Sequence, residues 1–270
     1  MAPNREALIA HLLATGMAGR VATPRENNLL HYLLLAHRDP DYLFGLDPGP
    51  QWTADAVLEL MARKVGVSPR LNFRRGVDTI DPERTAAALD RYAARFRVAL
   101  RDRQRVLFAT GHPRTLGPFY QLLAAALEQA GGTVVNAGAG LGYDGETRYG
   151  IQRLEVDFFL GVATLHDPGG PIHTHSAEPV QIVLAELAHT GDRMPDLVVA
   201  DHGWCGGAAQ AGLDAIGFAD CNDPALFVGE EEGTVAVAVP LDDGIDPDKY
   251  GLLADYILAD SYSDTADLNR

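Results

Sequence analysis

The sequence is short of cysteine, of positive charge and of long apolar runs, and each shortage excludes a class of protein. Its 270 residues include two cysteines, Cys205 and Cys221, too few for a disulfide framework. No apolar run approaches the length of a membrane span. Residues 1–16 lack the basic start, long apolar centre and cleavage site of a signal peptide. We therefore expect a cytoplasmic protein with reduced, buried thiols.

Positive charge is scarcest in the last third of the chain. The formal net charge of −15 argues against nucleic acid and against an anionic membrane surface as partners. Residues 201–270 contain 15 acidic and 2 basic residues, whereas the first 200 contain 22 and 20. This acidic third either keeps the protein soluble or supplies carboxylates that hold a divalent cation.

The first hundred residues carry the apolar spacing, capping residues and closing glycines of helices. Helices are predicted over residues 4–16, 53–66 and 81–103. The segments 23–28, 38–50 and 72–81 have too few apolar residues for buried strands, so we expect ordered loops there. Residues 1–104 are thus predicted to form a helical region packed on a core.

From residue 105 onward, short apolar runs alternate with helical segments, which is typical of parallel βαβ units. Strands are predicted over residues 106–110, 133–137, 157–163, 196–200, 214–219 and 234–240. Most of these runs are apolar on both faces, as a parallel sheet requires. We therefore predict a three-layer α/β core over residues 105–270, built on an open, mostly parallel, Rossmann-like sheet.

Polar side chains follow nearly every predicted strand, at the edge where open parallel sheets bind ligands. They lie in segments 111–115, 166–167, 201–204, 220–223 and 242–243. Turns alone would explain the glycine, asparagine and aspartate there. They would not explain why six of the nine histidines lie in this half of the chain. We therefore predict a functional site at this edge.

The segment HDPGGPIHTHS is the densest of these, because it holds His166, His173 and His175 within ten residues. In an extended chain His173 and His175 point the same way, which suits one metal ion or one phosphate. Asp167 could ligate the metal or orient a ring. The alternative is a solvated loop with turn residues over 168–171.

Three carboxylates are predicted metal ligands, Asp201, Asp220 and Asp223, with His173 and His175 as further ligands or as phosphate donors. Mixed carboxylate, amide and imidazole ligands suit Mg²⁺ or Mn²⁺ better than structural zinc, which would take thiolates. The alternative for Asp223 is a helix cap before a proline.

The turn GHPRT follows a predicted strand and opens a predicted helix, so its backbone N–H groups could attract an anion. His112 and Arg114 would add donors, and the alternative is a plain turn capped by Thr115. His166, His202 and His112 are the candidate catalytic residues, because imidazole titrates near neutral pH. Trp204 either stacks on a substrate ring or fills the edge of the core.

The acidic third would repel a phosphate ester unless a metal or basic side chains neutralised it. Basic groups are available in TPRENN, which contains Arg25, and in NFRRG, which contains Arg74 and Arg75. We predict that one of these loops folds over the strand ends and contacts the anion.

Several segments resemble one family of actinobacterial proteins of this size that are named only as phosphatases. The resemblance spans residues 21–253 and is carried by VATPRENNLLHYLLLAHRDPDYLFGL, DTIDPERTAAALD, RVLFATGHP, HTHSAEP and the long stretch beginning PDLVVADHGWCGG. It implies a phosphatase but assigns no catalytic residues. Cys205, the GYDGETRYG segment and the HDPGGPI segment depart from the family pattern, so substrate or reaction can differ here.

Together these features predict a metal-assisted hydrolase of a small-molecule phosphate monoester. One alternative is an isomerase, lyase or transferase for a phosphosugar or related polar metabolite. The other is a non-catalytic metabolite-binding protein. The expected partner is a small phosphorylated substrate, with no nucleic acid and no membrane, and a homodimer is allowed.

Overall fold

The computed structural model describes residues 3–147 and 150–259. The helices are α1 (Arg5–Thr15), α2 (Arg25–Ala36), α3 (Pro40–Leu43), α4 (Ala54–Lys64), α5 (Pro82–Arg101), α6 (Gly117–Gln129), α7 (Glu178–Thr190), α8 (His202–Gln210), α9 (Pro224–Glu232) and α10 (Gly251–Leu258). The strands are β1 (Gly19–Pro24), β2 (Val77–Ile80), β3 (Arg105–Ala109), β4 (Thr133–Val134), β5 (Gly142–Thr147), β6 (Gly150–Phe159), β7 (Val162–Asp167), β8 (Gly170–Ile172), β9 (Leu197–Asp201), β10 (Ala215–Ala219) and β11 (Val237–Pro240).

Within these ranges, nine strands form one open sheet in the order β11-β10-β9-β3-β7-β6-β5, with β4 beside β3 and β8 beside β7. The pairs among β3, β4, β7, β9, β10 and β11 are parallel, whereas β5 to β8 form antiparallel hairpins. The chain leaves β3 on one side and later returns to its other side as β9. The carboxyl ends of β3 and β9 therefore meet at a switch point, where such sheets bind ligands.

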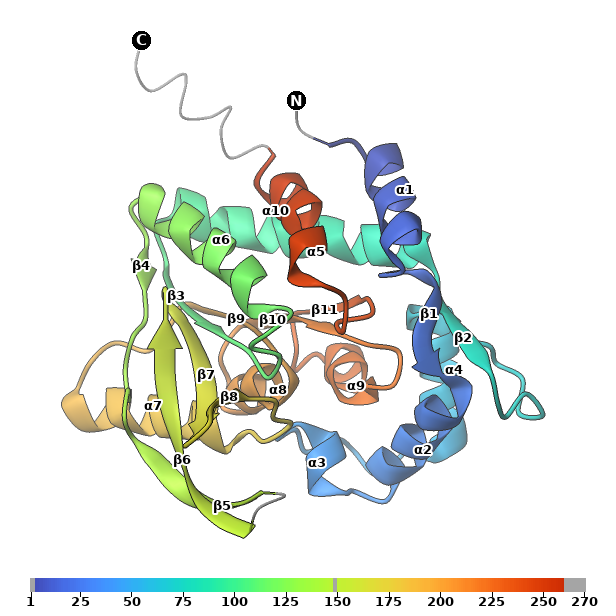
Figure 1. The fold of residues 1–270 in the computed structure, drawn as a ribbon, viewed down its shortest axis with the longest axis horizontal. Helices are drawn as coiled ribbons and strands as arrows, with labels where there is room; N and C mark the ends of the chain where they lie inside the picture. Colours follow the sequence, from blue (N-terminus) through green and yellow to red (C-terminus); the bar gives the residue numbers. More distant parts are fainter. Residues whose placement is uncertain (1–2, 148–149, 260–270) are drawn as a thin grey trace.

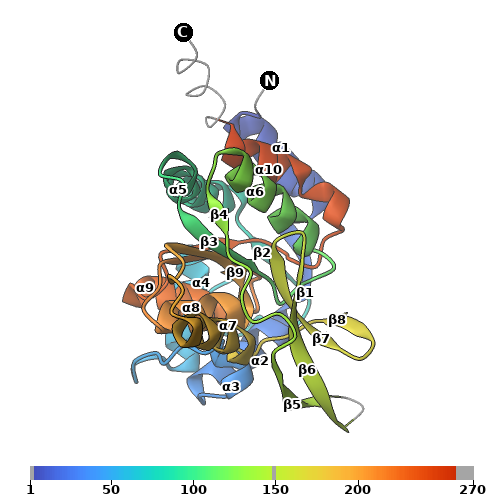
Figure 2. The same cartoon turned by 90° about the vertical axis from the view of Figure 1, so that its left-hand side faces the viewer.

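Helices cover both faces of the sheet, which confirms the predicted three-layer α/β architecture (Figure 1). On one face α5 packs on β11 and α6 on β3, with α1 and α10 against these helices. On the other face α8 and α9 contact β10, with α7 beside α8 (Figure 2). β9 and β10 are buried along their whole length, as expected of central parallel strands.

The predicted strand over residues 157–163 is wrong, because this apolar run spans the hairpin of β6 and β7. Leu160 and Gly161 make the turn, with φ of 48° and 81°. Two central residues with positive φ form the tight turn whose twist matches antiparallel strands. The predicted strand over 133–137 shortens to two residues, while β3, β9, β10 and β11 lie where the sequence places strands.

The three expected loops of the N-terminal region contain secondary structure instead. Segment 23–28 ends β1 and begins α2, segment 38–50 contains α3, and segment 72–81 contains β2. β1 and β2 pair antiparallel outside the main sheet. Exposed and buried residues alternate along β2. Continuous apolar runs are the sign from which buried strands are predicted, and β2 has no such run.

One hydrophobic core joins both regions of the chain, running from Leu8 in α1 to Leu258 in α10. The division at residue 104 stays a prediction. Cys205 and Cys221 are free and buried in this core, as expected. Over the described parts of the chain, no helix is long and apolar enough to cross a bilayer.

Candidate functional site

A cavity of about 350 Å³ opens at the carboxyl ends of the parallel strands, and we call it the inner cavity. Its lining consists of Thr23, His31, His112, His173, His175, His202, Asp220, Asn222, Asp223, Asp242, Asp243 and Gly244. These side chains come from β1, from α2, and from the segments that follow β3, β8, β9, β10 and β11. The predicted convergence of strand-end histidines and aspartates is therefore present.

Glycine lets the segment holding His173 and His175 approach the start of α8. A Cβ on Gly203 would lie 2.3 Å from the His175 carbonyl oxygen, and one on Gly111 would lie 2.4 Å from the Thr174 oxygen. His202 follows β9 directly with a φ of 46°, a conformation that costs a non-glycine residue energy. Such strain is maintained at functional sites, where surrounding contacts hold it.

Four imidazole rings pack together at this point. The His202 ring centroid lies 4.4 Å from that of His112 and 4.6 Å from that of His175, and His173 lies 4.5 Å from His112. One ring nitrogen from each of His112, His173 and His202 falls within 4.8 Å of the others. His175, His202 and Asp223 form a second such set. In both sets the ligand atoms are close enough to contact one cation.

Backbone carbonyls fix the tautomers of two of the lining histidines. His175 Nδ1 lies 3.0 Å from the Asp41 carbonyl oxygen, and His31 Nδ1 lies 2.9 Å from that of Asn222. A carbonyl oxygen only accepts hydrogen bonds, so each Nδ1 carries the hydrogen. In the neutral ring, Nε2 then keeps its lone pair, which is the form that binds a metal ion.

Asp201 lies behind the rings and does not line the inner cavity. Its Oδ1 accepts a hydrogen bond from Gly111 N at 3.2 Å. Its Oδ2 lies 3.2 Å from His112 Nδ1 and 3.5 Å from His202 Nδ1. A buried carboxylate at this distance from two ring nitrogens orients the imidazoles, the role that second-layer carboxylates play around metals.

Carboxylates form a third set, in which Asp220, Asp242 and Asp243 each place one oxygen within 4.8 Å of the others. Asp220 accepts hydrogen bonds from Thr23 Oγ1 and from Cys221 N. Asp242 accepts from Ala22 N at 3.1 Å and from Gly244 N at 3.0 Å. These bonds hold the carboxylates in place and leave lone pairs for a further ligand.

Several buried polar atoms of the inner cavity have no hydrogen-bond partner among the described residues. They are Asp223 Oδ1, Asp243 Oδ2, Asn222 Oδ1 and His202 Nδ1. Buried polar atoms in folded proteins nearly always form a hydrogen bond. Buried atoms that form none indicate that an ion or a water molecule binds there. Oxygen and nitrogen atoms of this kind fit a divalent cation.

The electrostatics of the cavity agree with a need for positive charge. Burial, together with the charge of Asp242, raises the pKa of Asp220 to about 7. Burial also raises the pKa of Asp223, and it raises the pKa of Asp243 by a larger amount. Burial lowers the pKa of His112, but Asp243 and Asp201 outweigh it and raise the value to about 9. His112 is thus a cation among carboxylates at neutral pH.

The other three rings of the imidazole group behave in the opposite way. Burial lowers the pKa of His175 to about 3, and the neighbouring ring of His202 lowers it in the same direction. Burial and the charge of His112 lower the pKa of His173, and they lower the pKa of His202 by a larger amount. These rings are neutral at physiological pH, as metal ligands must be.

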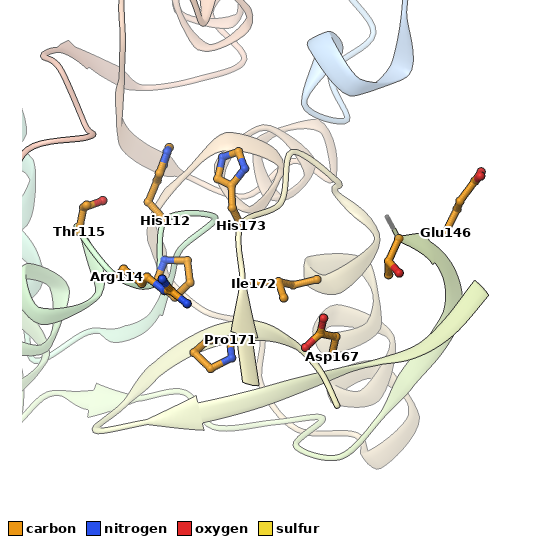
Figure 3. A pocket seen from close by; sticks show the side chains of 10 residues that line it. His112, Arg114, Thr115, Glu146, Asp167, Pro171, Ile172 and His173 are labelled. Carbon is orange, nitrogen blue, oxygen red and sulfur yellow. The ribbon is translucent and has the colours of Figure 1, made fainter. Parts of the chain in front are cut away.

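A second cavity of about 650 Å³, the outer cavity, shares His112 and His173 with the inner one (Figure 3). Its lining consists of His112, Pro113, Arg114, Thr115, Glu146, Thr147, Asp167, Pro171, Ile172 and His173. Arg114 is exposed and forms no ion pair among the described residues. The two unusual segments, GYDGETRYG and HDPGGPI, supply the far wall, although residues 148–149 lie outside the described ranges.

Comparison with known proteins places the chain in a family. A family model described as Phosphatase matches residues 3–264. This chain belongs to that phosphatase family. A curated relative, phosphatase SCO2771 of Streptomyces coelicolor, is 48% identical over 261 residues, which cover 96% of this chain and 97% of the relative. The resemblance read from the sequence is thereby confirmed.

Some residues predicted for the site lie away from both cavities of this phosphatase-family chain. His166 lies on β7 with its Nε2 2.9 Å from Thr164 Oγ1. Trp204 is fully buried in the core. Arg25 is fully buried against Asp78, with Arg25 Nη1 2.8 Å from Asp78 Oδ2. Their predicted catalytic and substrate-binding roles find no support in this arrangement and stay predictions.

Arg74 and Arg75 are exposed on the segment between α4 and β2, and neither lines a cavity described above. Their predicted contact with the substrate anion stays a prediction. Arg114, by contrast, lies beside His112 in the turn after β3, as expected.

The site of this phosphatase-family chain also contains residues that the sequence did not single out as ligands. His31 lies within the leucine-rich run of α2, where a lone histidine looks like any partly buried side chain. Thr23 is the next-to-last residue of β1 and belongs to no recognisable motif. Asp242 and Asp243 did carry a signal, because they follow the last predicted strand directly.

Proposed function

We propose that this phosphatase-family protein is a metal-assisted hydrolase of a small-molecule phosphate monoester. The family supports the reaction class. The observation that carries the metal is the inner cavity itself, where neutral imidazoles and buried carboxylate oxygens without hydrogen-bond partners converge. No common turn or cap requires such a cluster, and an uncompensated group of buried carboxylates would destabilise the fold.

His175, His202 and Asp223 are the proposed core of the cation site. Their ligand atoms lie within 4.8 Å of one another, and the carbonyl of Asp41 holds His175 in the ligating tautomer. Mg²⁺ prefers oxygen ligands in octahedral geometry, while imidazole suits the transition metals. The imidazoles therefore favour Mn²⁺ over Mg²⁺.

A divalent cation at these ligands would polarise the phosphoryl group and make an attacking water more acidic. His112 would bind the phosphoryl oxygens and protonate the leaving oxygen, because its raised pKa of about 9 keeps it protonated at neutral pH. Asp201 lies at His112 Nδ1, so Nε2–H remains available to the substrate. Asp201 thus acts as a positioning residue.

The outer cavity would hold the leaving group of the ester. His112 and His173 line both cavities, so a phosphate bound between them would direct its ester substituent into the outer one. A volume of about 650 Å³ suits a small metabolite rather than a folded protein. The exposed guanidinium of Arg114, which forms no ion pair within the described part of the chain, would bind a phosphoryl oxygen or an anionic group of the substituent.

Release of inorganic phosphate from a panel of phosphate monoesters tests this function. The chelated protein should be inactive, and Mn²⁺ or Mg²⁺ should restore turnover. Asp223→Asn and His175→Gln should lose most activity, whereas the exposed His189→Gln should match the wild type. Binding of a phosphorylated metabolite without phosphate release, at saturating metal, would contradict hydrolysis.

A further inference from the structure

We propose that the inner cavity holds two divalent cations in positions of different chemistry. One, the imidazole position, is formed by His175, His202 and Asp223. The other, the carboxylate position, is formed by Asp220, Asp242 and Asp243. Each set places its ligand atoms within 4.8 Å of one another, and both sets line the same cavity.

A contact between the two sets shows that the positions are neighbours. Within the imidazole position, His202 Nε2 lies 3.2 Å from Asp223 Oδ2. The same nitrogen lies 4.0 Å from Asp243 Oδ2 of the carboxylate position. Asp243 Oδ2, in turn, accepts no hydrogen bond among the described residues although Asp243 is 5% exposed. His112 Nδ1 lies 3.6 Å from the same oxygen, which is too far for a hydrogen bond. A buried carboxylate oxygen that accepts no hydrogen bond and lies between two candidate positions is suited to contribute to both.

The carboxylates around the cavity also favour more than one cation. Asp201, Asp220, Asp223, Asp242 and Asp243 are each at most 5% exposed. So many carboxyl groups gathered away from water destabilise the fold unless cations lie among them. Two divalent cations would also reduce the repulsion of a phosphate dianion in a medium of low dielectric constant more than one would.

The donor atoms predict that the two positions differ in metal preference. Oxygen-only ligands suit Mg²⁺, Ca²⁺ and Mn²⁺, whereas imidazole favours transition metals. Asp220 and Asp242 are already held by hydrogen bonds from Thr23 Oγ1, Cys221 N, Ala22 N and Gly244 N. The carboxylate position is therefore preorganised. We expect Mn²⁺ to fill both positions and Mg²⁺ to fill the carboxylate position first.

Because this inference rests on the proposed function, its test measures metal binding rather than activity. Chelated protein is titrated with Mn²⁺, the bound metal is counted per chain, and electron paramagnetic resonance reports whether the ions are coupled. Two Mn²⁺ per chain with a spin-coupled spectrum are expected. Asp243→Asn should reduce the count to one and leave an uncoupled six-line signal, and His175→Gln should do the same.

Matched controls separate loss of a ligand from loss of the fold. Asp246→Asn and His189→Gln remove the same chemical groups at exposed positions and should keep two coupled ions. Thermal unfolding of metal-free Asp243→Asn shows whether the variant folds, and we expect it to be at least as stable as the wild type. If it does not fold, anomalous diffraction from Mn²⁺-soaked wild-type crystals locates the ions directly.

One Mn²⁺ per chain at saturation, with an uncoupled signal, would overturn the inference while leaving single-metal hydrolysis intact. Two coupled ions in a protein that releases phosphate from no ester would uphold the inference and overturn the proposed function. Retention of two ions by Asp243→Asn would show that this carboxylate is no part of a second position.

Discussion

Replacing Arg25 should lower the stability of this protein without changing its affinity for substrate. The guanidinium is fully buried, with Nη1 2.8 Å from Asp78 Oδ2, and Asp78 also accepts from Asn28 Nδ2. Arg25 further donates to the carbonyl oxygens of Phe73 and Arg70. Arg25→Met would leave the Asp78 carboxylate buried with no cation beside it.

The expected cost follows from the burial of both partners. Removing one member of a buried ion pair typically costs about 3–5 kcal/mol, because the remaining charge is uncompensated. For a domain of this size, that corresponds to a drop in Tm of roughly 6–20 °C. Replacing both charges by apolar residues, as in Arg25→Met with Asp78→Leu, should recover a large part of the loss, because neither charge then remains buried.

Thermal unfolding of Arg25→Met, Asp78→Leu and the double variant provides the stability values, and KM for a phosphate ester is measured below the transition. Arg74→Ala and Arg75→Ala serve as controls, since both side chains are exposed. We expect a lower Tm and an unchanged KM for Arg25→Met. An unchanged Tm with a KM raised tenfold or more would refute this reasoning and restore Arg25 as a substrate contact.

Three further results are expected. Gly203→Ala should fold but lose about 10²-fold in kcat. The added Cβ would lie 2.3 Å from the His175 carbonyl oxygen and would displace the His175 ring. A wild-type kcat would contradict this packing. Arg114→Gln should raise KM about 10-fold, the value of one charge-assisted hydrogen bond, at constant metal content; unchanged KM would remove Arg114 from the substrate site. The metal-free protein should lose stability from pH 7 to 9, measured as Tm in chelator. Folding raises the pKa of His112 from 6.5 to about 9, so the stability from its proton is full below the unfolded value and disappears as the pH rises through the folded one. The corresponding loss for Asp220, whose pKa rises from 3.8 to about 7, lies below this window. A Tm that increases over this window would contradict the pKa directions.

The parallel strands and the edge they share could be predicted because both have local signals. Buried strands such as β9 and β10 are continuous apolar runs, and side chains such as His202 and Asp223 follow them within a few residues. Topology then brings the strand ends together. The approximate position of the inner cavity therefore follows from sequence alone.

The remaining features depend on contacts between distant residues. Arg25 looks like an available cation until Asp78, 53 residues later, pairs with it. His31 becomes part of the site because Asn222, 191 residues away, fixes its tautomer. The β6–β7 hairpin was missed because Leu160 interrupts the usual glycine or asparagine signal of a two-residue turn. No local pattern encodes any of these contacts.

Metal-dependent phosphate release is the most direct test of the central claim, that the histidines and aspartates of the inner cavity form a metal-assisted phosphatase site. The purified protein is chelated until elemental analysis finds no metal, and phosphate release from a small phosphate monoester is followed before and after Mn²⁺ is added. We predict no turnover before addition and restored turnover after it, with restoration lost in Asp223→Asn. Full turnover by the metal-free protein would contradict it.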